Sequence, residues 1–110
     1  AEEIEQKLAP VLVPDERIEL GFKLVRDMSV LTDRRLIFVD KQGVTGKKVE
    51  YHTIPYKSIT HFIVETAGRF DLDAELKIWV SGASEPMQKT LGRGVDIVML
   101  QKLLAAAVCC

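Results

Sequence analysis

Residues 30–40 read Val-Leu-Thr-Asp-Arg-Arg-Leu-Ile-Phe-Val-Asp, with short apolar runs on either side of a polar step at residues 32–35. Two such runs separated by a turn-like step are typical of neighbouring antiparallel strands. The second run, residues 36–39, is apolar at every position, as expected of a strand that is covered on both sides or lies near a barrel closure. This stretch therefore predicts the corner of a β-meander.

Alternation continues on both sides of this corner. Residues 17–24 place Ile18, Leu20, Phe22 and Leu24 on one predicted face, with polar residues or glycine between them. A period of two is typical of a half-buried strand. Four further strands are predicted by the same argument, at residues 48–53, 59–66, 70–81 and 87–91.

The two ends of the chain have helical spacing instead. Ile4 and Leu8 share one face of a short N-terminal helix that Pro10 stops. After the turn-like residues 92–94, an amphipathic helix is predicted, with Asp96 in its first turn. Its apolar positions recur every three to four residues, and they are Ile97, Leu100, Leu104 and Ala107 or Val108.

These elements predict a mainly β fold. About seven short antiparallel strands are expected to curl into a bent, partly open barrel that the C-terminal helix caps. We expect one domain over residues 1–110, with an N-terminal helical segment at 1–14, the barrel at 15–92 and the C-terminal helix at 94–108.

Composition and charge argue against several classes of function. The net charge is −1, so no overall field favours nucleic acid. The two cysteines, Cys109 and Cys110, are adjacent at the end of the chain and are interpreted as free thiols. No apolar run approaches the ~20 residues of a membrane span, and the acidic N-terminus does not resemble a signal peptide. A cytoplasmic location is expected.

Three stretches resemble the bacterial pleckstrin-homology-like domains. They are residues 31–40 (Leu-Thr-Asp-Arg-Arg-Leu-Ile-Phe-Val-Asp), 42–48 (Gln-Gly-Val-Thr-Gly-Lys-Lys) and 54–59 (Ile-Pro-Tyr-Lys-Ser-Ile). The resemblance extends from about Asp15 to Leu104. It implies the pleckstrin fold of a bent barrel and a capping helix. It also implies a non-catalytic module that tends to self-associate into ring-like homo-oligomers.

No catalytic, metal or cofactor site is predicted. The two histidines, His52 and His61, lie on neighbouring predicted strands without a third metal ligand near them in the sequence. The carboxylates Asp71, Asp73 and Glu75 alternate along one strand, which is typical of a solvated face. The sequence therefore favours a protein that is not an enzyme.

Lipid binding is an alternative that the resemblance suggests. Phosphoinositide-binding relatives use several Lys and Arg on the first hairpin loop, whereas residues 25–29 here offer one Arg beside one Asp. Lys41, Lys47 and Lys48 crowd another hairpin and form the alternative candidate contact for an anionic lipid or membrane surface. The Gly-Arg-Gly step at residues 92–94 is interpreted as a turn into the helix.

Self-association is the favoured function. Trp79 lies on the otherwise polar face of the most regular predicted strand, and tryptophan is enriched at the centres of protein interfaces. Cover by the chain's own N-terminal residues 4–13 is the alternative for this side chain. We therefore expect a scaffold that forms a homo-oligomer, in the form of a ring, or binds other protein partners.

Overall fold

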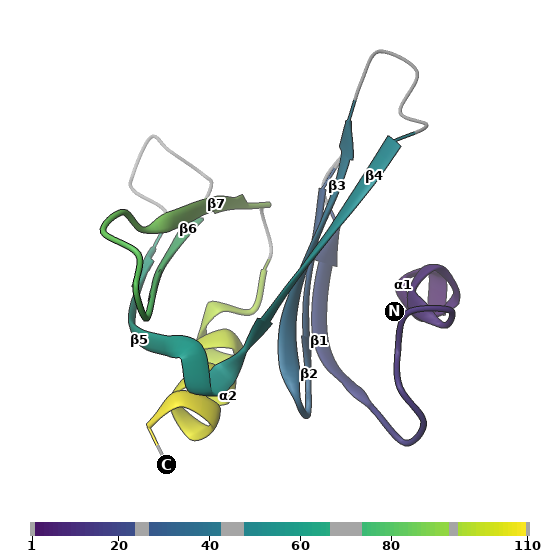
Figure 1. The fold of residues 1–110 in the computed structure, drawn as a ribbon, viewed down its shortest axis with the longest axis horizontal. Helices are drawn as coiled ribbons and strands as arrows, with labels where there is room; N and C mark the ends of the chain where they lie inside the picture. Colours follow the sequence, from purple (N-terminus) through teal and green to yellow (C-terminus); the bar gives the residue numbers. More distant parts are fainter. Residues whose placement is uncertain (1, 24–26, 43–47, 67–73, 93–94, 110) are drawn as a thin grey trace. The chain divides into compact units, whose positions relative to one another are not determined.

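The computed structural model describes residues 2–23, 27–42, 48–66, 74–92 and 95–109. Within these residues the chain forms two α-helices, a short 3-10 helix and seven strands (Figure 1). Their order is α1 (Glu2–Leu8), β1 (Ile18–Lys23), β2 (Asp27–Thr32), β3 (Arg35–Gln42), β4 (Lys48–Pro55), η1 (Tyr56–Ser58), β5 (Ile59–Glu65), β6 (Ala74–Val80), β7 (Met87–Leu91) and α2 (Ile97–Val108).

The strands form two antiparallel sheets, of order β1-β2-β3-β4 and β5-β6-β7. No strand pairing joins the two sheets within the described residues. The predicted mainly β fold, with seven strands and a helix at each end, is confirmed. Contacts divide the chain into unit 1, Ala1–Thr53, and unit 2, Ile54–Cys110. The single domain over residues 1–110 stays a prediction.

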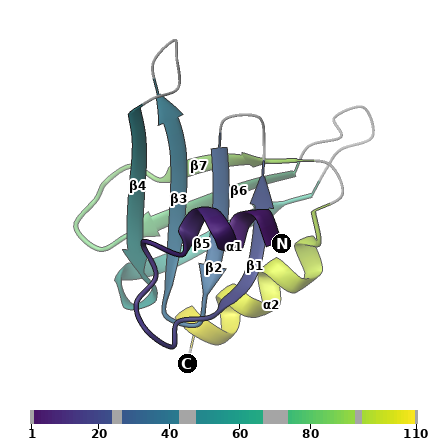
Figure 2. The ribbon, with the colours of Figure 1, turned by 90° about the vertical axis from the view of Figure 1, so that its right-hand side faces the viewer.

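In unit 1, α1 lies across one face of the four-stranded sheet (Figure 2). The reason is hydrophobic: Ile4 and Leu8 share one side of the helix and are almost fully buried. They pack against side chains that alternate along β2 and β3, namely Met28, Val30, Ile37 and Val39. The predicted N-terminal helix is confirmed, and its apolar side covers this sheet.

The predicted alternation of β1 is wrong because the strand contains a β-bulge. Ile18 pairs with Thr32 and Leu20 pairs with Leu31, so Glu19 is the extra residue. Ile18 therefore packs with the α1 cluster, while Leu20 lies on the opposite face. The face expected to be wet is covered by the helix.

Gly21 allows this close approach of α1. A Cβ atom at Gly21 would lie 3.0 Å from Cδ1 of Ile4, tighter than ordinary van der Waals contact. The absence of a side chain in β1 therefore leaves room for the helix.

In unit 2, the predicted alternation of β6 is confirmed. Ala74, Leu76 and Ile78 are buried, while the residues between them are partly exposed. The rest of the predicted strand, residues 70–73, lies outside the described residues. The α2 helix contacts β5 and η1, and it buries Leu100 and Leu104 as its period predicts.

The sequence suggested that Asp96 lies in the first turn of α2. It is instead the N-cap residue that precedes the helix. Its carboxylate accepts a hydrogen bond of 3.0 Å from the backbone N–H of Met99. The helix begins at Ile97, so one of its free N–H groups is satisfied by the preceding side chain.

Removing Leu8 tests the packing of α1. We expect Leu8→Ala to lower the free energy of unfolding by about 2–4 kcal/mol, because it opens a cavity in a fully buried cluster. Gln6→Ala changes an exposed residue of the same helix and is expected to stay within about 0.5 kcal/mol of the wild type. Urea unfolding at pH 7 measures both variants, and equal effects would contradict this packing.

Candidate functional site

The exposed face of the three-stranded sheet is the first candidate site. His61 on β5 pairs with Trp79 on β6, and their rings stack with centroids 4.4 Å apart and an interplanar angle of 15°. Ile63 follows on the same face with 44 % of its surface exposed. We call this surface the Trp79 face. Its central members are His61, Ile63, Lys77 and Trp79.

Polar pairs border these apolar groups. Lys77 Nζ lies 3.1 Å from Glu65 Oε1, and Gln88 donates a 2.9 Å hydrogen bond to Glu75. Because these pairs are exposed, they contribute little to stability. They do give the face an apolar centre with a polar rim, which is the usual arrangement of a protein interface.

A β-bulge places His61 beside Trp79. Ile59 pairs with Val80 and His61 pairs with Trp79, so Thr60 is the extra residue. Regular alternation along residues 59–66 predicts Ile59 and Ile63 on one side of β5. This prediction is wrong, since Ile59 is buried and Ile63 is on the exposed face. The hydroxyl of Thr60 donates to the backbone O of Trp79 at 3.2 Å.

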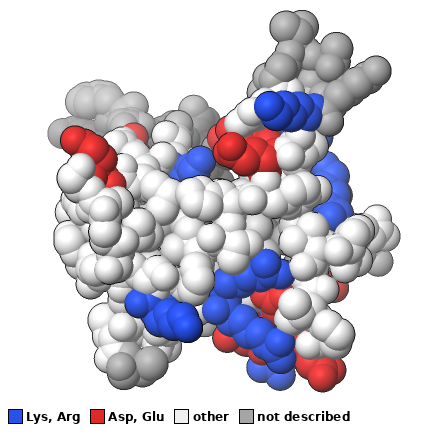
Figure 3. All heavy atoms as spheres, viewed as in Figure 1, with Lys and Arg blue, Asp and Glu red and all other residues white. Residues whose placement is uncertain are grey.

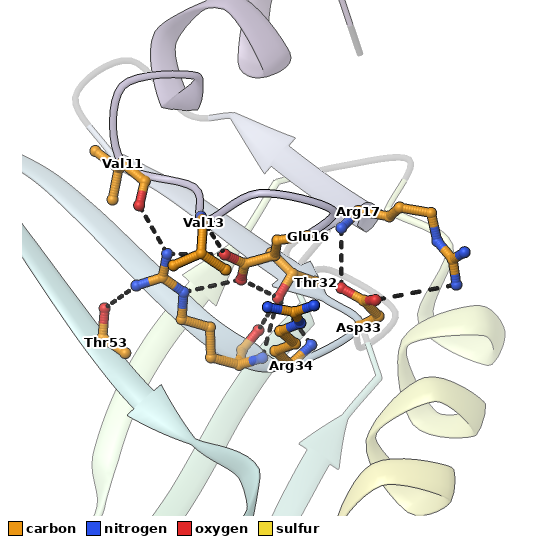
Figure 4. A network of polar contacts seen from close by, with 9 residues as sticks. Val11, Val13, Glu16, Arg17, Thr32, Asp33, Arg34 and Thr53 are labelled. Atoms are coloured by element: carbon orange, nitrogen blue, oxygen red, sulfur yellow. Dashed lines mark hydrogen bonds and ion pairs between the residues drawn. The ribbon is translucent and has the colours of Figure 1, made fainter.

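A buried ion pair between Arg35 and Glu16 lies at the corner formed by residues 30–40. The sequence did not predict the role of Glu16. Arg35, at the start of β3, binds Glu16 with two hydrogen bonds of 2.9 Å (Figure 4). The Glu16 side chain is fully buried. Arg35 also donates to the backbone O of Val11 at 2.9 Å and to the Thr53 hydroxyl at 3.0 Å.

Thr32 completes this network. Its hydroxyl donates to Glu16 at 2.6 Å and accepts the backbone N–H groups of Arg34 and Arg35 at 3.0 Å. Figure 3 shows acidic and basic side chains next to one another at this corner of unit 1. Because Arg35 and Thr32 satisfy the fully buried carboxylate of Glu16, this network is structural.

The network lowers the pKa of the Glu16 carboxyl from 4.5 to about 2. The hydrogen bonds from Arg35 are the main cause, and those from Thr32 and the Val13 backbone add to it, while burial opposes them. Since the folded-state pKa lies below the unfolded value, the stabilisation is present above about pH 4.5 and is lost as the pH falls towards 2.

The candidate lipid lysines are not all brought together. Val49 packs with the α1 cluster, so Lys48, its neighbour in β4, lies on the opposite face of the sheet. The positive charges of Lys23 and Lys41 lower the pKa of Lys7 on α1, so Lys41 is grouped with these two lysines and not with Lys48. Lys47 lies outside the described residues. Asp27, which was expected in the first hairpin loop, belongs to β2.

The remaining polar candidates do not form a site. His52 is exposed on β4, and His61 is occupied in the ring stack. The described residues contain no group of three or more His, Cys, Asp or Glu placed to hold a metal ion. Cys109 is an exposed free thiol. Asp71, Asp73 and Arg93 lie outside the described residues, and Cys110 does too. No helix in the described part of the chain is long and apolar enough to cross a membrane.

Comparison with known proteins identifies relatives over nearly the whole chain. The model of a family described as "Bacterial PH domain" matches residues 1–108. Two proteins of Bacillus subtilis, "Uncharacterized protein YjqA" and "Uncharacterized protein YozO", are 58% and 34% identical over 104 residues. These matches cover 94% of this chain, with 83% of YjqA and 89% of YozO.

Solved structures agree with this relationship. A DUF1696 family protein with a pleckstrin-homology domain from Shewanella loihica is 53% identical, with a TM-score of 0.86 over 97% of this chain and 92% of that one. A pleckstrin homology domain from Shewanella amazonensis is 55% identical, with a TM-score of 0.78 over 97% of this chain and 86% of that one. The resemblance seen in the sequence is confirmed.

Replacing Glu16 tests the buried network. At pH 7, we expect Glu16→Gln to lower the free energy of unfolding by about 2–3 kcal/mol, because it leaves Arg35 partly unpaired. At pH 3 the difference from the wild type is expected to shrink, because Glu16 is protonated in the unfolded wild type, with a pKa of 4.5, while the folded state still holds it ionised, with a pKa of about 2.

Urea unfolding at both pH values measures the difference, with Glu50→Gln on the exposed side of β4 as the control. A Glu16→Gln variant whose deficit is the same at pH 3 and pH 7 would show that the ion pair is not the source of the stabilisation.

Proposed function

The chain belongs to the bacterial PH domain family, and from that premise we propose that it is a non-catalytic scaffold in the cytoplasm that self-associates through the Trp79 face. The observation that carries this proposal is the stack of the half-buried Trp79 ring on the exposed His61, beside an Ile63 that is 44 % exposed. Aromatic groups of this kind dominate the binding energy of protein interfaces.

The surroundings of the stack support the same function. Two polar pairs surround it, Lys77 with Glu65 and Gln88 with Glu75. Because these groups are already paired, a partner needs to desolvate few unpaired charges. β5 and β7 are the edge strands of their sheet. Edge strands offer backbone groups for pairing between subunits. Repetition of one such contact around an axis gives a closed ring.

Mass in solution tests this proposal. Light scattering on a sizing column is expected to give a concentration-independent multiple of 12.3 kDa for the wild type. Trp79→Ala is expected to weaken association by about 30-fold or more, because it removes the centre of the interface. The oligomer is expected to persist in 1 M salt, roughly the range where charge pairs are screened.

Tyr51→Ala is the control, since Tyr51 is an aromatic residue with 47 % of its surface exposed that lies in unit 1. Circular dichroism checks that each variant is folded. A wild type of 12.3 kDa at all concentrations, or a folded Trp79→Ala variant of unchanged mass, would contradict the proposal.

Weak binding of an anionic lipid surface is the second candidate, and one observation favours it. Lys7, Lys23 and Lys41 come close enough together in unit 1 for their charges to interact, although Lys23 is paired with Glu3. Three neighbouring ammonium groups attract an anionic surface in a salt-dependent way.

Vesicles containing phosphatidylserine test this candidate. Co-sedimentation at low salt is expected to decrease steeply as salt is added and to disappear when Lys7, Lys23 and Lys41 are changed to Glu. Lys57→Glu and Lys102→Glu, both exposed in unit 2, serve as controls. Binding that resists salt, or that survives the triple change, would exclude this mode.

A further inference from the structure

A cleft of about 230 Å³ lies between α1 and β1, within unit 1. Its lining combines apolar side chains, a glycine and two carboxylates. The lining residues are Ile4, Glu5, Ile18, Glu19, Leu20 and Gly21. At this volume the cleft is smaller than the usual site for a drug-sized ligand, about 300–1,000 Å³, and suits a single side chain better.

One wall of the cleft is a strand edge. Among the described residues β1 pairs with β2 alone, so it is an edge strand of its sheet. The bulge disturbs the pairing at Glu19, but Leu20 to Lys23 keep regular register with Leu31 to Met28. A regular strand edge beside an apolar cleft is the arrangement that binds an added strand.

The charge of the cleft selects its occupant. Its lining includes Glu5 and Glu19 but no Lys or Arg. Arg17 lies 3.8 Å from Glu19, but its side chain is 76% exposed. An ion pair that open to water is weak, so a competing cation can displace it at little cost. A basic partner therefore complements the cleft.

From this juxtaposition of a strand edge, an apolar cleft and two carboxylates, we propose that the α1–β1 cleft binds an extended segment of a partner protein in which an apolar residue has Lys or Arg two positions before and after it, so that all three side chains share one face. The backbone of the segment adds to β1. One apolar side chain enters between Ile4 and Ile18, and the basic side chains meet Glu5 and Glu19. This inference does not depend on self-association through the Trp79 face.

A designed peptide tests the proposal on the full chain. The probe is acetyl-Lys-Thr-Val-Thr-Lys-Thr-amide, in which the two Lys and the central Val share one face of the extended strand. It is titrated into isotopically labelled protein and followed by backbone amide NMR. We expect saturable shifts that centre on Leu20 and Gly21 and extend to Ile4. Glu5→Gln combined with Glu19→Gln is expected to weaken binding about tenfold, because both complementary charges are lost.

Three controls isolate the parts of the proposal. Glu50→Gln removes an exposed carboxylate of β4 outside the cleft and is expected to leave binding unchanged. A peptide with Glu in place of Lys is expected to bind at least about tenfold more weakly. A peptide with Pro in place of the central Val is expected not to bind, because it cannot complete the backbone pairing.

Several results would overturn the inference. They are an absence of shifts up to about 1 mM peptide, shifts centred on His61 and Trp79, and equal binding of the Glu or Pro peptide. Light scattering of the Glu5→Gln, Glu19→Gln variant can give a further contradicting result. A fall in oligomer mass would show that the cleft contacts another copy of this chain. An unchanged mass together with weakened peptide binding supports the inference.

Discussion

The ion pair between Glu16 and Arg35 is the interaction on which the arrangement of unit 1 depends. Arg35 belongs to β3, and through its guanidinium it holds the carboxylate of Glu16, the backbone of Val11 and the hydroxyl of Thr53. These groups come from the segment after α1 and from β4. One side chain thus fixes the path by which the chain leaves α1 and enters β1, and so sets where α1 meets the sheet.

A polar interaction does this because hydrophobic burial has no direction. Ile4 and Leu8 gain nearly the same free energy in any position that removes them from water. The planar guanidinium of Arg35 donates its hydrogen bonds only in fixed directions, and the carboxylate of Glu16 accepts two of them at once. The apolar cluster supplies the energy that holds α1 down, and the ion pair determines the position.

Local patterns in the sequence were enough to predict the elements of the fold. The alternation of β6, the period of α2 and the end of α1 before Pro10 all depend on residues close in the chain. The buried position of Glu16 could not be predicted, because its partner Arg35 lies 19 residues away in the sequence. The residues next to Glu16 form no pattern that indicates a buried carboxylate. A polar residue just before a strand reads as an ordinary loop residue until the corner is formed.

The positions of the candidate sites were harder to predict, since both depend on β-bulges. A bulge inserts one extra residue into a strand, and no particular residue type in the sequence marks it. Compared with regular alternation, every later residue of the strand then lies on the opposite face. At Glu19, this reversal puts Gly21 beneath α1 and forms the cleft wall. At Thr60, it keeps Ile59 buried while it turns His61 out onto Trp79.

The same bulges also explain why these surfaces are available at all. If β5 alternated regularly from the buried Ile59, His61 would point to the buried side and the ring of Trp79 would have no aromatic neighbour. If β1 alternated regularly from Ile18, Leu20 would face α1 in the place of Gly21, and the helix would have to move away from the sheet. The irregular residues therefore create both candidate surfaces, while the regular strands around them keep the core intact.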